Sequence, residues 1–374
     1  MWAQRAQASY DALQKYLYLG PLQNGLYLED YPFQAGDNNY SYLWTITEAE
    51  NAAIDMAGTP GGAPVYSAQV SSDTAAIGLY ASDSPTLPDG GTNATAPNPA
   101  YESYLPAPLG TSGDAYYDDN SVLALTYVSR YEQDKDPAAL KSAKQTFAFV
   151  EQAWDSNSSD VCAGGMKWVD ASWNTIRAAN VTGLAAQVAA HLYELTKDSS
   201  YLNWAVKLYD WNAQCLQQSP GLYSNSITYT GTVDPTLWSY NSGFMIAAAA
   251  LLYRATGDKT WLDKAVADAN GAVSYWTTGG ADSTQPAIFN AMFFQDLLLL
   301  DSISPHAAYV QAVSQYAELA WDNFRNPATG LFQLQASGGG PYDPTARPQT
   351  LEQSGMVQIF AALAWPKGRY GDIA

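Results

Sequence analysis

The chain has 374 residues, of which 47% are hydrophobic and 13% aromatic, and its formal net charge is −19. Such an apolar and aromatic content excludes a disordered chain, because it supports a large hydrophobic core. The acidic balance excludes a nucleic-acid-binding protein, which needs clustered Lys and Arg to replace the counterions of phosphate, and it argues against an anionic membrane surface or polysaccharide as partner.

The N-terminal part of the chain predicts two helices. Ala3 to Leu17 has an amphipathic pattern, and Ser41 to Met56 is largely apolar. No signal peptide precedes them, and the longest nearly apolar run, Phe244 to Tyr253, is too short to span a bilayer. We therefore expect a secreted or cell-surface protein whose signal peptide has been removed, with no membrane span.

A long polar loop follows, from Ser82 to Ser112. It carries Asp89-Gly-Gly and several prolines, which favour turns over regular structure. A loop of this length inside a compact domain is usually functional or mobile. Two interpretations stay open, a wall of a cleft and a plain surface excursion.

Three later segments repeat one pattern at intervals of about 60 residues. Each begins with an Asp that can cap a helix N-terminus and continues with an apolar helical stripe. These segments are Asp136 to Ala143, Asp198 to Ala205 and Asp258 to Ala265. The repetition predicts a structural unit that recurs along the chain.

Upstream of each Asp-capped helix lies a second helix that is apolar nearly all round. These helices are Ser121 to Val128, Val181 to Ala190 and Ser242 to Tyr253. A helix that is apolar on every side must be buried on every side. Each is opened by an asparagine, Asn120, Asn180 or Asn241, for which helix capping is the simplest role.

The same unit continues less regularly to the C-terminus. Ala287 to Leu300 with Ala307 to Asn323 forms one more pair, and Leu351 to Ala364, with Gln353 at its start, forms a sixth inner helix. The N-terminal helix can supply its missing outer partner. We therefore predict an all-α fold, an (α/α)6 toroid of six helical hairpins in one domain spanning residues 1–374. An open α-solenoid and a globin-like bundle are the alternatives, and one short β-hairpin is expected near Ile227 to Thr230.

The chemically most informative residues are two adjacent carboxylates, Asp118 and Asp119. Adjacent acids are common on solvated surfaces, but this pair follows Tyr116 and Tyr117 and leads into a wholly apolar helix. Two carboxylates held close together have their pKa values pushed apart, so that one is ionised while the other holds a proton. Cleavage of a glycosidic bond needs this division, and the aromatic-rich, acidic composition fits a neutral, hydroxyl-rich ligand.

Three motifs resemble those of glycoside hydrolase family 76. They are Tyr117-Asp118-Asp119-Asn120, then Gly164-Gly165-Met166-Lys167-Trp168, and Trp238-Ser-Tyr240-Asn241-Ser-Gly243. The likeness runs in order from about residue 40 to Ala364. Two positions depart from the family pattern: Lys167 replaces an aromatic residue and Asn225 replaces an Asp, and both positions are expected to line sugar subsites.

The resemblance implies a retaining endo-acting α-1,6-mannanase, a secreted hydrolase of mannan backbones. It implies Asp118 as the nucleophile and Asp119 as the general acid/base of a double displacement. Substrate-binding positions implied in this way are Tyr117, Asn120, Gly164, Gly165, Trp168, Asn225, Trp238, Tyr240 and Asn241. Trp44 and Trp173 are weaker candidates for stacking on sugars. Transglycosylation, another α-linked glycan as substrate, and a non-catalytic glycan-binding toroid are the alternatives.

The sequence contains few residues for a metal site, a redox site or a histidine-based catalytic site. His191 and His306 lie in no motif, and Cys162 and Cys215 lack the spacing of a metal or redox site, although they can pair with each other. The acidic residues Asp30, Asp37, Glu48 and Glu50 lack the spacing of a calcium-binding loop. We expect no metal, no cofactor and a monomer whose partner is its polysaccharide or oligosaccharide substrate.

Overall fold

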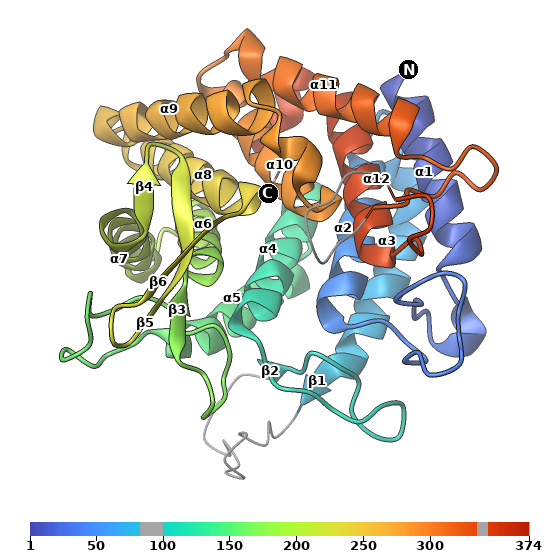
Figure 1. Cartoon of the computed structure of the whole chain (residues 1–374), viewed down its shortest axis with the longest axis horizontal. Coiled ribbons are helices and arrows are strands. Elements are labelled where there is room, and N and C mark those ends of the chain that lie inside the picture. Colours follow the sequence, from blue (N-terminus) through green and yellow to red (C-terminus); the bar gives the residue numbers. More distant parts are fainter. Residues whose placement is uncertain (83–99, 335–342, 374) are drawn as a thin grey trace. The chain divides into compact units, whose positions relative to one another are not determined.

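A computed structural model describes residues 1–82, 100–334 and 343–373, in which helices predominate (Figure 1). The chain forms two compact units. Unit 1 comprises residues 1–80, 104–111 and 275–373, and unit 2 comprises residues 81–103 and 112–274. The Asp89-Gly-Gly part of the predicted long loop lies outside the described residues.

Unit 2 contains three helical hairpins. Its inner helices are α4 (Tyr117–Asp134), α6 (Ala179–Thr196) and α8 (Ser239–Thr256), and their outer partners are α5 (Pro137–Val150), α7 (Ser199–Cys215) and α9 (Lys259–Val273). Each inner helix packs against its outer partner, and α6 packs between α4 and α8. The inner helices are buried along most of their length because their side chains are apolar on nearly every face.

The three turns inside these hairpins share one design. Each inner helix ends in a left-handed residue, Lys135, Lys197 or Gly257, and the next residue is the Asp that caps the outer helix. The side chains of Asp136, Asp198 and Asp258 each accept a hydrogen bond of 2.9 Å from a backbone N–H of the first helical turn. The predicted capping role of these three residues is confirmed.

The predicted capping role of the asparagines is wrong. The N-cap positions of α4, α6 and α8 are Tyr116, Ala178 and Trp238, and none of them caps through its side chain. Asn120, Asn180 and Asn241 follow these N-caps and lie in the first turn of each helix. A carboxamide in the first turn has its own backbone N–H directed along the helix axis, so its side chain is free to bind other segments.

Unit 1 contains the remaining three hairpins. The inner helices are α2 (Leu43–Gly58), α10 (Ala287–Ile303) and α12 (Thr350–Ala364), and the outer helices are α3 (Ala63–Ile77), α11 (Ala307–Asn323) and α1 (Trp2–Tyr16). Helix α12 packs between α2 and α10, and α1 packs on α12, as the sequence predicted for the N-terminal helix. Gln353 does not cap α12; its amide holds the backbone of Ser9 and Phe332.

Strands are short and more numerous than the one hairpin expected. In unit 2, β5 (Leu222–Thr228) pairs with β3 (Ile176–Ala178), β4 (Gln217–Ser219) and β6 (Val233–Leu237), all antiparallel. The expected hairpin is β5–β6, with Gly231 at φ +94° in its turn. A separate pair joins β1 (Ala81–Ser82) to β2 (Ala100–Tyr101).

Short 3₁₀ segments join the helices. They are η1 (Pro21–Gln23), η2 (Gly78–Tyr80), η3 (Glu151–Ala153), η5 (Ala281–Thr284) and η6 (Lys367–Asp372), with one π-helical turn, η4 (Ser274–Thr278). Within the described ranges, none of the helices has the length and apolar character needed to cross a membrane.

Candidate active site

The two adjacent carboxylates lie in the first turn of α4, in unit 2. Tyr116 is the N-cap of this helix, so Asp118 and Asp119 are its second and third helical residues. The sequence suggested that they lie in the loop before the helix, and the structure corrects this placement. The N-terminus of a helix carries a partial positive charge and unpaired N–H groups that favour anions. Both side chains are half-buried, so they remain reachable by a ligand.

Asp118 is held by three donors. Its Oδ2 accepts hydrogen bonds from Nε1 of Trp168 and Nδ2 of Asn180, each at 2.8 Å, and its Oδ1 accepts one from the backbone N–H of Asp119 at 3.1 Å. Hydrogen bonds to a carboxylate favour its ionised form. Burial nevertheless raises the pKa of Asp118 to about 6, and these hydrogen bonds oppose that rise.

Asp119 has a different environment. Its carboxyl group receives no hydrogen bond from any residue in the described part of the chain. Burial, and next the negative charge of Asp118, raise the pKa of Asp119 well above the range of an ordinary carboxyl group. The two neighbouring carboxyl groups therefore differ: the hydrogen bonds of Asp118 favour its ionised form, whereas burial and the charge of Asp118 favour the protonated form of Asp119.

A short ladder holds Trp168 beside the pair. The backbone N–H of Tyr117 donates to the carbonyl of Trp168 at 2.9 Å, and that of Asp170 donates to the carbonyl of Ala115 at 3.0 Å. The indole N–H thereby reaches Asp118 although 50 residues separate the two in sequence. The first turn of α4 and the loop before β3 are thus joined into one site.

The loop that carries Trp168 is itself held in place by a buried arginine and a disulfide. Arg177 is fully buried and donates to the carbonyls of Val161, Cys162, Gly164 and Thr228, and its guanidinium lies 3.5 Å from the carboxylate of Asp155. Cys162 forms a disulfide with Cys215 at the end of α7, which settles the pairing that the sequence left open. Both devices restrict the loop before β3.

Three aromatic rings surround the Asp118 side of the site. Tyr116 packs edge-on against Trp168 with ring centroids 5.0 Å apart, and Trp173 lies 6.2 Å from Trp168 at an interplanar angle of 83°. The indole N–H of Trp173 donates to Asp114 at 3.1 Å. These residues, Tyr116, Trp168 and Trp173, are called the aromatic cluster below.

Several predicted substrate-binding residues lie in the protein interior. Tyr117 is 3% exposed and stacks on Phe149, and Asn120 is fully buried, where its amide bonds the backbone of Tyr101 on β2. Asn241 is also fully buried, and neither atom of its amide finds a hydrogen-bond partner among the described residues. Burial leaves these three side chains without a surface for direct contact with a ligand.

Gly164 and Gly165 have a backbone role. Both adopt positive φ, +104° and +83°, and a Cβ at Gly165 would lie 2.4 Å from the ring of Trp211. Only glycine allows this combination of a left-handed backbone and close ring packing. The pair thus fixes the path of the loop toward Trp168.

Of the remaining predicted substrate-binding residues, Tyr240 lies near the Asp pair, Trp238 lies at the start of helix α8 and Asn225 lies on strand β5. Tyr240 is 8% exposed and in hydrogen-bonding contact with Asn180, and burial and the charge of Asp118 raise its pKa. Trp238 is the half-buried N-cap of α8. Asn225 lies on β5 and donates to Asp234 of β6 at 2.8 Å. Trp168 and Tyr240 are therefore the predicted aromatic residues that the structure links to the Asp pair.

Sequence reasoning missed the residues that position the site. Asn180 was expected to cap α6, but it holds Asp118, and Arg177 and Asp114 were not singled out. A buried arginine in a chain with few basic residues is a usable signal, because its charge needs several buried acceptors. The partner carbonyls, however, come from two segments, residues 161–164 and Thr228, and cannot be paired from sequence.

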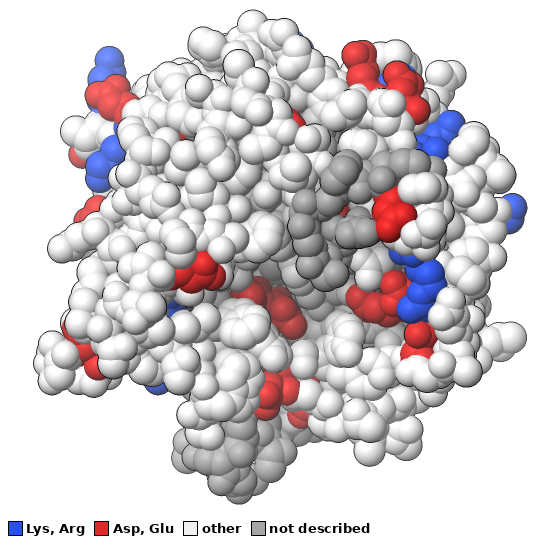
Figure 2. All heavy atoms as spheres, in the orientation of Figure 1, with Lys and Arg blue, Asp and Glu red and all other residues white. Residues whose placement is uncertain are grey.

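The other titratable residues considered have structural surroundings. His191 is buried on α6, where burial lowers its pKa to about 3, and His306 caps α11. Arg347 binds Asp37 at 2.6 Å and Asp30 at 3.3 Å. The described residues contain no group of three or more metal-ligating side chains. Figure 2 shows a face on which charged side chains are scattered among wide uncharged areas, with Lys and Arg sparse.

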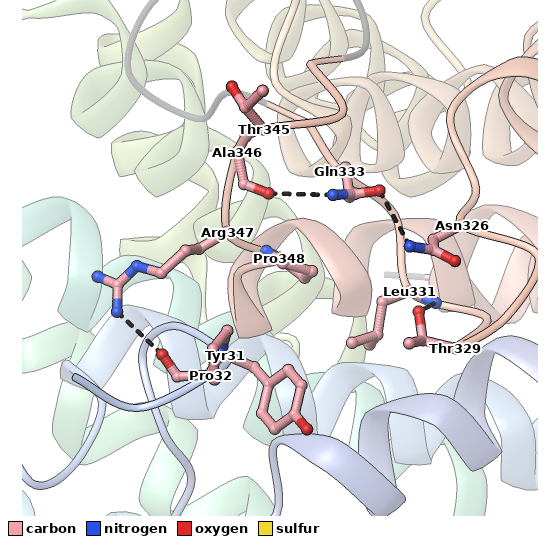
Figure 3. A pocket seen from close by; sticks show the side chains of 10 residues that line it. All are labelled: Tyr31, Pro32, Asn326, Thr329, Leu331, Gln333, Thr345, Ala346, Arg347 and Pro348. Atoms are coloured by element: carbon pink, nitrogen blue, oxygen red, sulfur yellow. Dashed lines mark hydrogen bonds between the residues drawn. The ribbon is translucent and has the colours of Figure 1, made fainter.

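A hollow of about 290 Å³ in unit 1 also has space for a small ligand (Figure 3). Its polar groups are already used: Gln333 donates to the carbonyl of Ala346, Asn326 donates to Gln333, and Arg347 donates to the carbonyl of Pro32. These bonds tie neighbouring loops together. Because the hollow lacks a pair of carboxylates, it is a weaker candidate for catalysis than the Asp pair of unit 2.

Comparison with known proteins agrees with this geometry. The sequence profile of Glycosyl hydrolase family 76 matches residues 3–365. A mannan endo-1,6-alpha-mannosidase of Saccharomyces cerevisiae is 28% identical over 171 residues, which cover 41% of this chain and 37% of that protein. The chain thus spans less than half the length of the curated relatives it matches.

Solved structures match over nearly the whole chain. A family 76 mannosidase from Bacteroides thetaiotaomicron is 23% identical with a TM-score of 0.82, and the match covers 97% of this chain and 98% of that one. An inactive variant of an α-1,6-mannanase of Salegentibacter sp. HEL1_6, in complex with α-1,6-mannotriose, is 22% identical with a TM-score of 0.74, covering 97% and 99%. This likeness confirms the predicted fold class, the (α/α)6 toroid. The chain belongs to glycosyl hydrolase family 76.

Proposed function

We propose that this protein is a retaining, endo-acting α-1,6-mannanase with Asp118 as nucleophile and Asp119 as general acid/base. The observation that carries the proposal is the unequal bonding of two adjacent carboxyl groups. Asp118 accepts three hydrogen bonds, whereas the carboxyl group of Asp119 receives none from the described residues. The first arrangement favours a carboxylate anion and the second a neutral acid.

The reaction follows from these two states. An oxygen of Asp118 attacks the anomeric carbon while the glycosidic oxygen takes the proton of Asp119, so the glycosidic bond breaks and a covalent glycosyl–Asp118 ester forms. Asp119 then removes a proton from water, whose oxygen attacks the same carbon and releases Asp118. Two inversions retain the anomeric configuration. Trp168 and Asn180 keep the attacking oxygen of Asp118 in place.

The substrate class rests on the relatives. The Salegentibacter protein binds α-1,6-mannotriose when two consecutive aspartates are replaced, and the yeast relatives are named mannan endo-1,6-alpha-mannosidases. The sparse positive charge of this chain agrees with a neutral glycan. The Cys162–Cys215 disulfide supports action in an oxidising compartment, and therefore secretion or display on the cell surface.

The first test removes each aspartate in turn. Wild type should release short manno-oligosaccharides from unbranched α-1,6-mannan, whereas Asp118→Asn and Asp119→Asn should not. Asp210→Asn, on the exposed face of α7, is the matched control and should behave as wild type. No release by the wild type would sink the mannanase assignment, and new oligosaccharides longer than the substrate would indicate transglycosylation.

Azide rescue then assigns the roles. With an activated aryl α-mannoside, Asp119→Ala should regain turnover in azide and give the α-mannosyl azide, since the covalent intermediate still forms. Asp118→Ala should instead give the β-azide, because azide then attacks the substrate directly. The opposite products from the two variants would exchange the assigned roles.

A further inference from the structure

The surface beside the Asp pair carries an exposed tryptophan that the proposed mechanism does not use. Trp173 is 49% exposed, and it is the only exposed tryptophan in the part of the chain that the structure describes. An exposed indole leaves a large apolar face in water, and a ligand that covers this face would gain from removing it from water.

The orientation of Trp173 is fixed from three sides. Its indole N–H donates to Asp114, one ring contact joins it to Trp168, and another joins it to Tyr116 at 6.4 Å. The turn that carries it is closed by a backbone hydrogen bond from Asn174 to Ala171, and the amide of Asn174 is bonded in turn. A side chain that merely projected into solvent would not be held in this way.

The position of Trp173 links it to the reaction. Trp168 donates directly to the proposed nucleophile, and Trp173 is the next ring outward in the same aromatic cluster. A flat apolar face next to a carboxylate acceptor such as Asp114 suits a pyranose, which has one C–H-rich face and hydroxyl groups at its edge. No cation lies in these contacts to favour an anionic ligand.

We infer that Trp173, oriented by Asp114, stacks on a mannosyl unit of the glycan outside the sugar that reacts at Asp118. This inference rests on the proposed function. Trp173 is thereby a residue that selects for glycan length, and Asp114 is a positioning residue. The enzyme gains affinity for longer chains because an additional sugar covers the exposed indole.

The test compares manno-oligosaccharides of increasing length. Trp173→Ala should lower kcat/KM about tenfold more for long oligosaccharides than for the shortest one that is cleaved. Trp173→Phe, which keeps an aromatic face, should show an intermediate loss. Tyr275→Ala in unit 1 is the matched control, because Tyr275 is 42% exposed and also packs edge-on against a tryptophan.

Asp114 provides the second arm. Asp114→Ala should reproduce the length-dependent loss, whereas Asp114→Asn should restore wild-type values, since its amide oxygen still accepts from the indole. Binding of a long α-1,6-manno-oligosaccharide to the inactive Asp118→Asn variant should change tryptophan fluorescence, and that change should shrink with Trp173→Phe.

The outcomes distinguish this inference from the function on which it rests. If the wild type does not cleave α-1,6-mannan, the proposed function and this inference both fall. If the wild type cleaves it but Trp173→Ala loses the same factor at every chain length, or loses nothing, the mannanase stands and the stacking role is overturned. Thermal unfolding of each variant shows whether a loss reflects the site or the fold.

Discussion

Each unit of the molecule carries an acidic residue in the first turn of an inner helix, but the two are used differently. Asp118 lies at the start of α4 in unit 2, and Glu352 at the start of α12 in unit 1. Burial raises the pKa of both, to about 6 and about 7. Asp118 is bonded by side chains and keeps partial exposure, whereas Glu352 is fully buried and accepts from the backbone N–H groups of Ala287 and Ile288.

The difference shows that a raised pKa at a helix N-terminus does not by itself mark a catalytic acid. In unit 1 two carboxylates accept hydrogen bonds from the start of a helix other than their own. Glu352 caps α10, and Glu29 accepts from Tyr42 N–H and Thr45 Oγ1 at the start of α2. Those N–H groups would otherwise be unpaired. Catalysis needs access and a second acid: Glu352 has no exposed surface, whereas Asp118 is half-buried and adjacent to Asp119.

The largest expected effect comes from removing each charge in turn. Asp118→Asn should lower kcat by ~10⁴-fold or more, because it removes the proposed nucleophile, while the melting temperature stays equal or rises because a charge is removed from a desolvated position. Glu352→Gln should lower the free energy of unfolding by about 1–3 kcal/mol at pH 5.5, below the raised pKa of Glu352, because an acceptor for two buried N–H groups is weakened. The Glu352→Gln molecules that are folded should have the kcat of the wild type.

Mannan hydrolysis and thermal unfolding, measured on the same preparations, check this separation. Asp136→Asn, which keeps a capping oxygen on α5, controls for a general effect of removing a carboxylate. Loss of kcat in folded Glu352→Gln, without a shift in melting temperature, would contradict the division between the units.

The disulfide gives the next effect, and it belongs to unit 2 alone. Cys162 and Cys215 are separated by 53 residues, so their bond removes considerable chain entropy from the unfolded state. The double variant Cys162→Ala with Cys215→Ala should lose about 2–4 kcal/mol of stability. Hydrogen exchange should rise in the loop that carries Trp168 and stay unchanged in α12. A reductant should destabilise the wild type but not the double variant.

A smaller effect is expected from the indole that donates to the proposed nucleophile. Trp168→Phe removes one of the two side-chain donors to Asp118, which should cost about 1.5–3 kcal/mol in kcat/KM. The pKa of Asp118 should rise further, so the acid limb of the pH–rate profile, near pH 6 in the wild type, should move to higher pH. Trp204→Phe, on α7, is the control. An unmoved acid limb would show that Trp168 does not tune Asp118.

Much of the fold could be predicted because its signals are local. Asp136, Asp198 and Asp258 each combine a capping side chain with an apolar stripe, and both are read within a few residues. The inner helices were recognisable for the same reason, since Phe244 to Tyr253 offers no polar face. The extra strands β3 and β4 were missed because each is only three residues long.

The site was predictable only in part, because its contacts are long-range. The Asp pair stood out as two adjacent acids before an apolar helix, and Trp168 through the resemblance. The role of Asn180 was misread, since a first-turn amide and a cap look alike in sequence, and only the fold shows that Asp118 is within reach. Trp173 gained meaning only when its exposure and its bond to Asp114 were known.

The smallest effect concerns pH and contrasts the units once more. Glu29 and Glu352 have pKa values raised by burial to about 7, above the unfolded value of 4.5. Their contribution to the free energy of unfolding is therefore complete below pH 4.5 and is lost as pH rises through 7. His191 in unit 2 has its pKa lowered by burial to about 3, so its contribution is present above pH 6.5 and lost as pH falls toward 3. Each group should account for on the order of 1–3 kcal/mol. The melting temperature should therefore be higher at pH 5.5 than at pH 8 or pH 3.5. Glu352→Gln should reduce the fall in melting temperature between pH 5.5 and pH 8, and His191→Leu should reduce the fall between pH 5.5 and pH 3.5. A melting temperature that rises steadily from pH 5 to pH 8 would contradict the assignment of Glu29 and Glu352 as buried caps.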